Sequence, residues 1–196
     1  MEKIKNNYYA TEWVGLTKTE AYKRAGEYED EVGEILLKRC GFLSVIYTRD
    51  NIIAKKRADE RGLTLPDLYG SHKNKKNYWV EVKRKNRRLK FNDTGLDVNL
   101  IKNYLKVQKE FDGRVVIVFK DNSSELPVKS KSWFKDVWYG GFLDELDTST
   151  PNNPITTFKD PHKTNSYIKC FPLSKMKEID NIWKGTQTHF ILKEFD

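Results

Sequence analysis

The sequence has few of the features that mark secreted, membrane and disulfide-stabilised proteins. Its 196 residues include two cysteines, Cys40 and Cys170, which are too few for a disulfide framework. No apolar run approaches the roughly 20 residues that a membrane-spanning helix needs, and the first residues lack the apolar segment of a signal peptide. We therefore expect a soluble cytoplasmic protein with no membrane partner.

Positive charge is abundant but unevenly distributed along the chain. The net charge is +8, and the segment from Arg49 to Lys90 holds 14 Lys and Arg residues against 5 Asp and Glu residues. The rest of the chain holds 22 against 23 and is close to neutral. A local excess of positive charge indicates a polyanionic partner such as nucleic acid. A solvated lysine-rich surface is the alternative interpretation.

Acidic and basic residues interrupt an apolar segment inside this basic region. Residues 78–84 read Tyr-Trp-Val-Glu-Val-Lys-Arg, a pattern that favours a β-strand. Alternate side chains of a strand point to opposite faces, so Glu81 and Lys83 share one polar face with Trp79, whose presence indicates that this face is partly covered. Asp67 ends a short extended segment and stands opposite these two charged residues if the two segments pair.

Five further segments show a clear apolar periodicity. In chain order they predict a helix at about 18–40, a strand at 42–47, a helix at about 97–111, and strands at 114–119 and 167–171. We expect the strand at 42–47 to be buried. Residues 114–119 form a nearly continuous apolar run, which is typical of a strand covered on both faces. The second helix is expected to turn Val98, Ile101 and Leu105 toward the core.

Polar composition predicts less regular structure elsewhere. Residues 71–77 are expected to form a loop that exposes His72, and residues 147–163 a long polar connection. Ser174 is a candidate N-cap for a helix that ends near Trp183.

Two short motifs resemble those of a known enzyme superfamily. Pro66-Asp67, followed after a spacer by Glu81-Val82-Lys83, is similar to the motif of the PD-(D/E)XK nucleases. The predicted order helix, strand, strand, strand, helix, strand agrees with the core of that superfamily. The resemblance implies an α/β, restriction-endonuclease-like fold, in which helices flank a central mixed β-sheet. We expect a single domain over residues 1–196, with a nuclease core at about 18–120 and a C-terminal elaboration at about 121–196 packed on it.

The resemblance further implies a metal-dependent DNA endonuclease that hydrolyses phosphodiester bonds in restriction, recombination or a phage or mobile-element pathway. Asp67, Glu81 and the Val82 carbonyl would hold Mg²⁺ or Mn²⁺, because such hard cations prefer oxygen ligands. Lys83 would lie beside the metal-bound water and offset negative charge in the transition state.

The first helix carries several acidic residues, most of which we interpret as a solvated face. The first helix of this superfamily often adds a carboxylate to the metal site. Glu29 is the candidate because it lies at the edge of the apolar stripe, and Asp30 and Glu31 are its rivals.

Basic and polar residues near the proposed site are candidates for contact with DNA, because lysine, arginine and asparagine suit contacts to backbone phosphates. The candidates are Lys73, Lys75 and Lys76 in the predicted loop, Lys85, Arg87, Arg88 and Lys90 after the strand, and Asn103 and Lys106 in the second helix. Cleavage of both strands of a duplex commonly needs two active sites, so a homodimer is a further expectation.

Other functions are compatible with the same fold. A non-catalytic DNA-binding or inhibitory protein would keep the fold and the charge, but such a protein would usually have lost one of Asp67, Glu81 and Lys83. An exonuclease or an RNA-directed nuclease would keep all three residues, and the preference for DNA rests on analogy with the superfamily.

Overall fold

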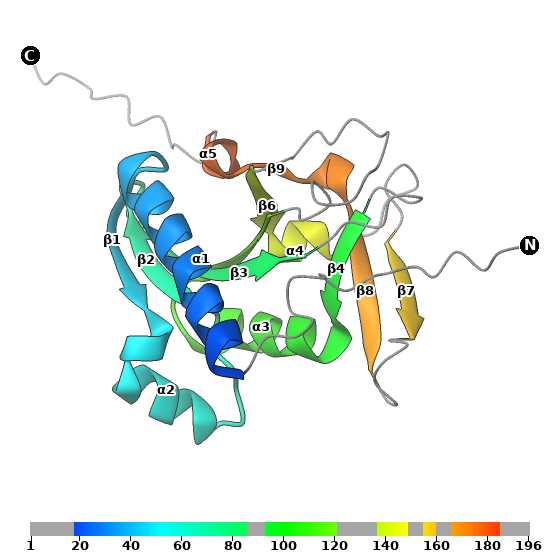
Figure 1. Ribbon diagram of the computed structural model, residues 1–196, viewed down its shortest axis with the longest axis horizontal. Helices are drawn as coiled ribbons and strands as arrows, with labels where there is room; N and C mark the ends of the chain where they lie inside the picture. The colour runs from blue at the N-terminus through cyan, green and yellow to red at the C-terminus, as the bar shows by residue number, and fades with distance from the viewer. Residues whose placement is uncertain (1–17, 86–92, 121–136, 149–154, 160–165, 185–196) are drawn as a thin grey trace, which may run out of the picture.

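The computed structural model describes residues 18–85, 93–120, 137–148, 155–159 and 166–184 (Figure 1). In chain order the elements are α1 (Lys18–Lys38), β1 (Phe42–Tyr47), the 3₁₀ helix η2 (Thr48–Asp50), α2 (Ile52–Asp59), β2 (Leu68–His72), β3 (Asn77–Arg84), β4 (Asp93–Asp97), α3 (Val98–Glu110), β5 (Arg114–Lys120), β6 (Trp138–Phe142), α4 (Leu143–Leu146), β7 (Thr156–Lys159), β8 (Tyr167–Pro172), the 3₁₀ helix η4 (Leu173–Lys175), β9 (Lys177–Glu178) and α5 (Ile179–Ile182). Of the helices described, none has both the length and the apolar composition that crossing a membrane requires.

A six-stranded mixed sheet forms the centre of the structure, in the order β1-β2-β3-β5-β6-β9. β3 and β5 run parallel, with α3 in the crossover between them, and the other neighbouring pairs are antiparallel. A smaller antiparallel sheet has the order β4-β8-β7. The predicted fold is therefore confirmed, since helices flank a central mixed sheet (Figure 1).

Apolar side chains cover both faces of the two central strands. On one face, Val32 and Leu36 of α1 belong to the same buried cluster as Val80 and Val82 of β3. Burial of a side chain of this size contributes about 1.5–3 kcal/mol to folding. α1 is therefore fixed against β3, which matters because α1 carries Glu29 and β3 carries Glu81.

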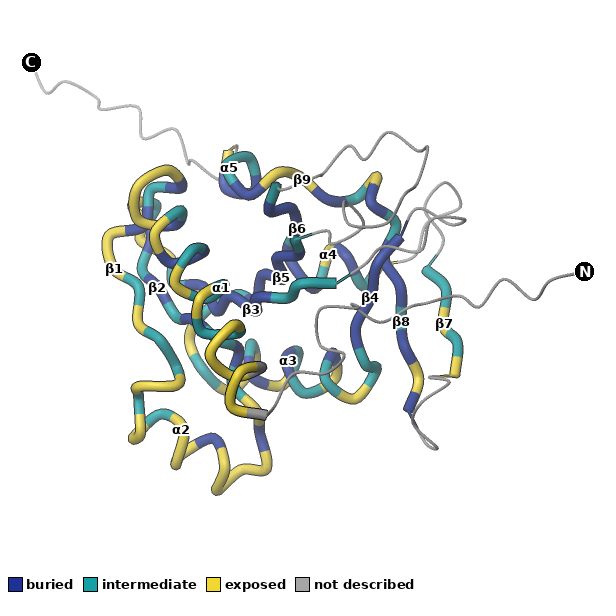
Figure 2. The backbone as a smooth tube through the Cα atoms, in the orientation of Figure 1, coloured by how far each residue is buried: buried dark blue, intermediate teal, exposed yellow. Residues whose placement is uncertain are grey.

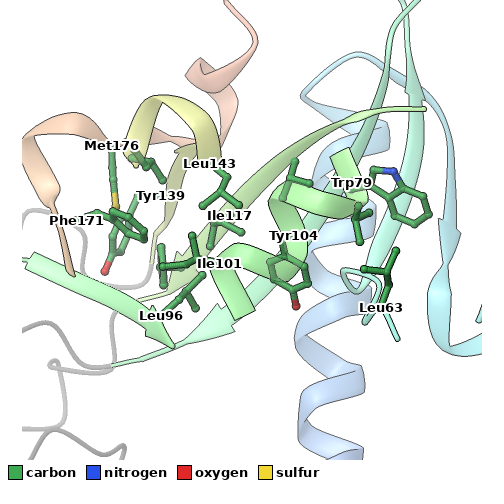
Figure 3. Close-up of a cluster of buried hydrophobic side chains, with 14 of the residues drawn as sticks. Leu63, Trp79, Leu96, Ile101, Tyr104, Ile117, Tyr139, Leu143, Phe171 and Met176 are labelled. Atoms are coloured by element: carbon green, nitrogen blue, oxygen red, sulfur yellow. The ribbon is translucent and has the colours of Figure 1, made fainter. Parts of the chain in front are cut away.

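The opposite face packs against α3 and α4. Trp79 of β3 and Ile117 of β5 lie in one buried cluster with Ile101 and Tyr104 of α3 and Leu143 of α4 (Figure 3). Because layers cover both faces of the sheet here, β3 and β5 are buried along most of their length (Figure 2). The position of β3 is thus determined from both faces.

β1 has the predicted bounds, but the expectation that it is buried is wrong. Leu43 is 73% exposed and Ile46 is 45% exposed. The six-stranded sheet ends at β1, so this strand pairs on one side with β2. An apolar run indicates full burial only for a strand whose two faces are both covered, and β1 is not covered in this way.

The predicted exposure of His72 is also wrong. Residues 71 and 72 continue β2 instead of forming a loop, and His72 is 2% exposed. Its Nε2 lies 2.9 Å from the Cys40 carbonyl oxygen, and its Nδ1 accepts a hydrogen bond from the Asn74 amide at 3.1 Å. The histidine is buried because both ring nitrogens find partners in the protein.

α3 forms where predicted but buries a different set of residues. Ile101, Tyr104 and Val107 are buried, whereas Leu105 packs only partly against the core. The helix begins after Asp97, whose side chain accepts a hydrogen bond from the Asn99 amide at 2.8 Å. The strand β4, which leads into this cap, was not predicted.

The last third of the chain is predicted only in part. β8 confirms the strand expected at 167–171, and β7 lies within the segment expected to be a polar connection. The helix predicted from Ser174 to Trp183 is wrong, because η4, β9 and the four-residue α5 occupy this segment.

The close approach of β6 to β5 gives a test of the sheet register. A Cβ atom at Gly140 would lie 1.9 Å from the Ile117 carbonyl oxygen, whereas one at Gly141 would meet Leu146 side-chain atoms at 3.3 Å. Gly140→Ala should lower the free energy of unfolding by about 3 kcal/mol. Gly141→Ala should lower it by less than about 1.5 kcal/mol, because a leucine side chain can shift. Equal losses for the two variants in urea unfolding would contradict the β5–β6 register.

Candidate active site

The candidate site lies where two neighbouring strands separate. The β2–β3 pairing ends at Leu68 opposite Val80, whereas β3 continues beside β5 as far as Arg84 opposite Lys120. The chain that precedes β2 leaves the sheet at this point and carries Asp67. We call this separation the strand fork.

Asp67 is oriented by three hydrogen bonds at the strand fork. Its Oδ2 accepts a hydrogen bond from the Val82 amide at 2.8 Å. The Thr48 amide donates to the Asp67 carbonyl oxygen at 2.9 Å, and the Thr48 hydroxyl donates to the Pro66 carbonyl oxygen at 2.5 Å. The amide and carbonyl of one strand residue point to the same side, so the Val82 carbonyl also faces the Asp67 side of β3.

Glu81 is buried more completely than a partly covered face would imply. It is 1% exposed and forms an ion pair with Lys83, whose side chain is 30% exposed. Burial, followed by the negative charge of Asp67, raises the pKa of Glu81 above its ordinary value. Burial alone would lower the pKa of Lys83, but the carboxylates of Glu81 and Asp67 outweigh it and raise that pKa.

Glu29 of α1 lies on the same side of the molecule as Asp67. Its side chain is 14% exposed and accepts a hydrogen bond from Arg49 Nη1 at 2.8 Å. Burial, and then the charge of Asp67, raise the pKa of Glu29 to about 7, although Arg49 and Lys83 act in the opposite direction. Of the rival residues, Asp30 pairs with the other terminal nitrogen of Arg49 and Glu31 pairs with Lys120.

Two pockets meet at these carboxylates. One, of about 210 Å³, lies between the strand fork and α2, and its lining includes Arg49 and Lys55. The other, of about 320 Å³, lies between α1 and the end of β3. Glu29 and Asp67 line both pockets, so the acidic residues stand where a substrate could reach them.

The oxygen atoms at the strand fork suit a hard divalent cation. Within the described ranges, no three His, Cys, Asp or Glu side chains lie close enough to hold a metal by themselves. Two carboxylates and a carbonyl, here from Asp67, Glu81 and Val82, are sufficient for Mg²⁺, which keeps several of its waters. Glu81 Oε2 supports this fit, since it is buried with no hydrogen-bond partner among the described residues.

The predicted nucleic-acid contacts fall into separate groups. Lys73, Lys75 and Lys76 lie in the turn at the opposite end of the β2–β3 hairpin from Asp67. Lys85 follows β3 and donates to the Gly95 carbonyl oxygen at 2.9 Å, whereas Arg87, Arg88 and Lys90 lie outside the described residues.

The two candidates on α3 also differ from each other. Asn103 Nδ2 donates to the carbonyl oxygen of Thr64, a residue that lines the smaller pocket, at 2.6 Å. Lys106 is exposed on the surface of the helix.

Arg49 and Tyr104 adjoin the candidate site but were not predicted from the sequence. Arg49 also donates to the Gly26 carbonyl oxygen at 3.1 Å and thereby joins η2 to α1. Tyr104 approaches Glu81 from α3, and its hydroxyl favours the charged form of the Glu81 carboxyl by lowering the pKa of Glu81. Tyr104 follows Ile101 by three residues, so helical spacing could have placed it on the buried face.

The raised pKa of Glu29 predicts a pH dependence of stability. In the unfolded chain Glu29 loses its proton near pH 4.5, but in the folded protein it keeps the proton up to about pH 7. The metal-free protein should therefore lose stability as pH rises through this window, by up to about 3 kcal/mol from this group. Glu29→Gln should remove that loss. Urea unfolding in chelator between pH 4.5 and 8 tests this, and a constant difference between variant and wild type would contradict it.

Comparison with known proteins finds no matching protein family model and no match among curated proteins. Among solved structures, the chain is similar to the Holliday junction resolvase Hjc of Archaeoglobus fulgidus, an archaeal hyperthermophile. The sequence identity is 13% and the TM-score is 0.48, and the alignment covers 80% of this chain and 98% of the resolvase chain. It is also similar to a nuclease from a fusselovirus, at 11% identity and a TM-score of 0.43, covering 88% and 98%. In its motif residues and in the order of its helices and strands, the chain resembles the PD-(D/E)XK nucleases.

Proposed function

We propose that the protein is a divalent-metal-dependent nuclease that hydrolyses phosphodiester bonds of DNA at the strand fork. The observation that carries this proposal is the Asp67–Val82 hydrogen bond. It directs a carboxylate to the part of β3 that also holds the buried Glu81 and its ion-pair partner Lys83. Two acids and one base are thereby gathered beside two pockets.

Each residue has a distinct role in this proposal. Asp67, Glu81 and the Val82 carbonyl hold the cation, which when bound polarises the phosphate and lowers the pKa of a water ligand. Lys83, already directed toward Glu81, stabilises the negative charge that develops on the phosphate. Glu29 adds a carboxylate at the α1 side, and Arg49 keeps it in place.

DNA as the substrate is supported by the basic side chains that line the two pockets, Arg49 and Lys55 in one and Lys83 and Arg84 in the other. The positive excess of the chain lies between Arg49 and Lys90, the segment that contains the strand fork. Phosphate contacts from such a region would give affinity that falls steeply with salt concentration. Cleavage of both strands of a duplex commonly needs two such sites, which a homodimer would supply.

Removing either acidic ligand should stop cleavage. Asp67→Asn or Glu81→Gln should lower the cleavage rate by about 100-fold or more, because the cation loses a charged ligand. Chelator should have the same effect on the wild type. The assay follows cleavage of supercoiled, linear, single-stranded and branched DNA with Mg²⁺ or Mn²⁺.

The matched control for these variants is Glu34→Gln on α1, where the side chain is 67% exposed and pairs with Lys38. This variant should cleave at the wild-type rate. Cleavage retained by Asp67→Asn would rule out the assigned metal site.

Replacing Lys83 should separate turnover from metal binding. Lys83→Met should lower turnover by about 100-fold, while the affinity for Mn²⁺ measured by titration calorimetry stays within a few-fold of wild type. Normal turnover in this variant would remove Lys83 from the mechanism.

A further inference from the structure

The pocket of about 320 Å³ beside the strand fork is lined by side chains of both charges. Glu29 and Asp67 contribute carboxylates to the lining, and Lys83 and Arg84 at the end of β3 contribute cations. Its volume is at the lower end of the range of ligand-binding pockets. A bound ligand would therefore meet both carboxylates and cations.

Arg84 and Lys83 enter this pocket from different sides of the strand. Consecutive residues of a strand point to opposite faces, and Lys83 is directed toward Glu81. Arg84 is directed toward α1, where Nη1 donates a hydrogen bond to the Tyr28 hydroxyl. The part of β3 that carries both residues lies beyond the last β2 pair, so both can line one pocket.

Tyr28 supports the Arg84 guanidinium. The Arg84 Cζ atom lies 4.9 Å from the centroid of the Tyr28 ring, which gives a cation–π contact in addition to the hydrogen bond. The Tyr28 ring is itself packed edge-on against Trp138, with 6.4 Å between centroids. An arginine supported in this way loses less conformational entropy when it binds an anion.

We propose that Arg84, supported by Tyr28, forms a phosphate subsite that holds a backbone phosphate next to the scissile one. This inference rests on the proposed function, because it assumes a DNA strand in the pocket. The planar guanidinium matches two phosphate oxygens, a geometry that lysine cannot reproduce. The carboxylates of Glu29 and Asp67 in the same lining repel a phosphate, so a cation bound to them should strengthen binding at Arg84.

Binding measurements test the subsite without relying on cleavage. The probe is a short fluorescent DNA, single-stranded or duplex, titrated at several salt concentrations with Ca²⁺ and with chelator. Arg84→Ala should weaken binding in Ca²⁺ about tenfold and reduce the salt slope by about one. Arg84→Lys should keep the slope but recover only part of the affinity, because it lacks the planar guanidinium.

A neutral methylphosphonate, placed at each position of the DNA in turn, identifies the contacted phosphate. One substitution should weaken binding by the wild type but have no further effect on Arg84→Ala. Tyr28→Phe, which removes the hydroxyl and keeps the ring, should weaken binding by a smaller factor than Arg84→Ala. The matched control is Arg39→Ala, since Arg39 lies beyond the C-terminal end of α1 in an exposed pair with Asp180. It should bind as the wild type does.

Several outcomes would overturn the subsite. Unchanged affinity and salt slope in Arg84→Ala would do so. A methylphosphonate effect that is as large in Arg84→Ala as in the wild type, at every position of the DNA, would also do so. If in that case Glu81→Gln still abolishes cleavage, the proposed nuclease function stands and only the subsite fails. A wild-type protein that neither binds nor cleaves DNA would refute both.

Discussion

The hydrogen bond from the Val82 amide to Asp67 Oδ2 is the contact on which the candidate site depends. It occupies the edge of β3 just beyond the last pair with β2, where the strands separate. A carboxylate there replaces a strand neighbour, satisfies a backbone donor, and keeps its second oxygen for another partner. Without this contact, Asp67 would be a turn residue with no fixed relation to Glu81.

The site buries the carboxylate of Glu81, and other interactions of the fold have to offset the unfavourable free energy of that burial. Burial of a carboxylate is unfavourable, and Glu81 keeps one oxygen without a partner among the described residues. The compensation comes from apolar packing on both faces of β3, by α1 on one face and by α3 and α4 on the other. A bound cation would satisfy the remaining oxygen, so the same residues that weaken the metal-free protein would serve the reaction.

The sequence was sufficient to predict the central elements because their patterns are local. The alternation in β3 and the continuous apolar run in β5 gave nearly correct bounds for both strands, and the motif residues indicated which fold to expect. Exposure could not be predicted in the same way. Glu81 is buried because α3 covers its face, and β1 is exposed because the sheet ends there, and neither fact is encoded in the segment itself.

Long-range contacts were the other source of error. Arg49 reaches Glu29 across 20 positions of the chain, and β4 is a strand because β8 pairs with it. Such pairings depend on residues distant in the sequence, so the periodicity of one short segment cannot predict them.

The most direct test of the strand fork as a metal site is anomalous diffraction from crystals soaked in Mn²⁺. The expected result is one strong anomalous peak between the carboxylates of Asp67 and Glu81, within bonding distance of the Val82 carbonyl. A peak elsewhere would contradict the assignment. So would crystals at saturating Mn²⁺ that show no peak and keep the ion pair between Lys83 and Glu81 intact.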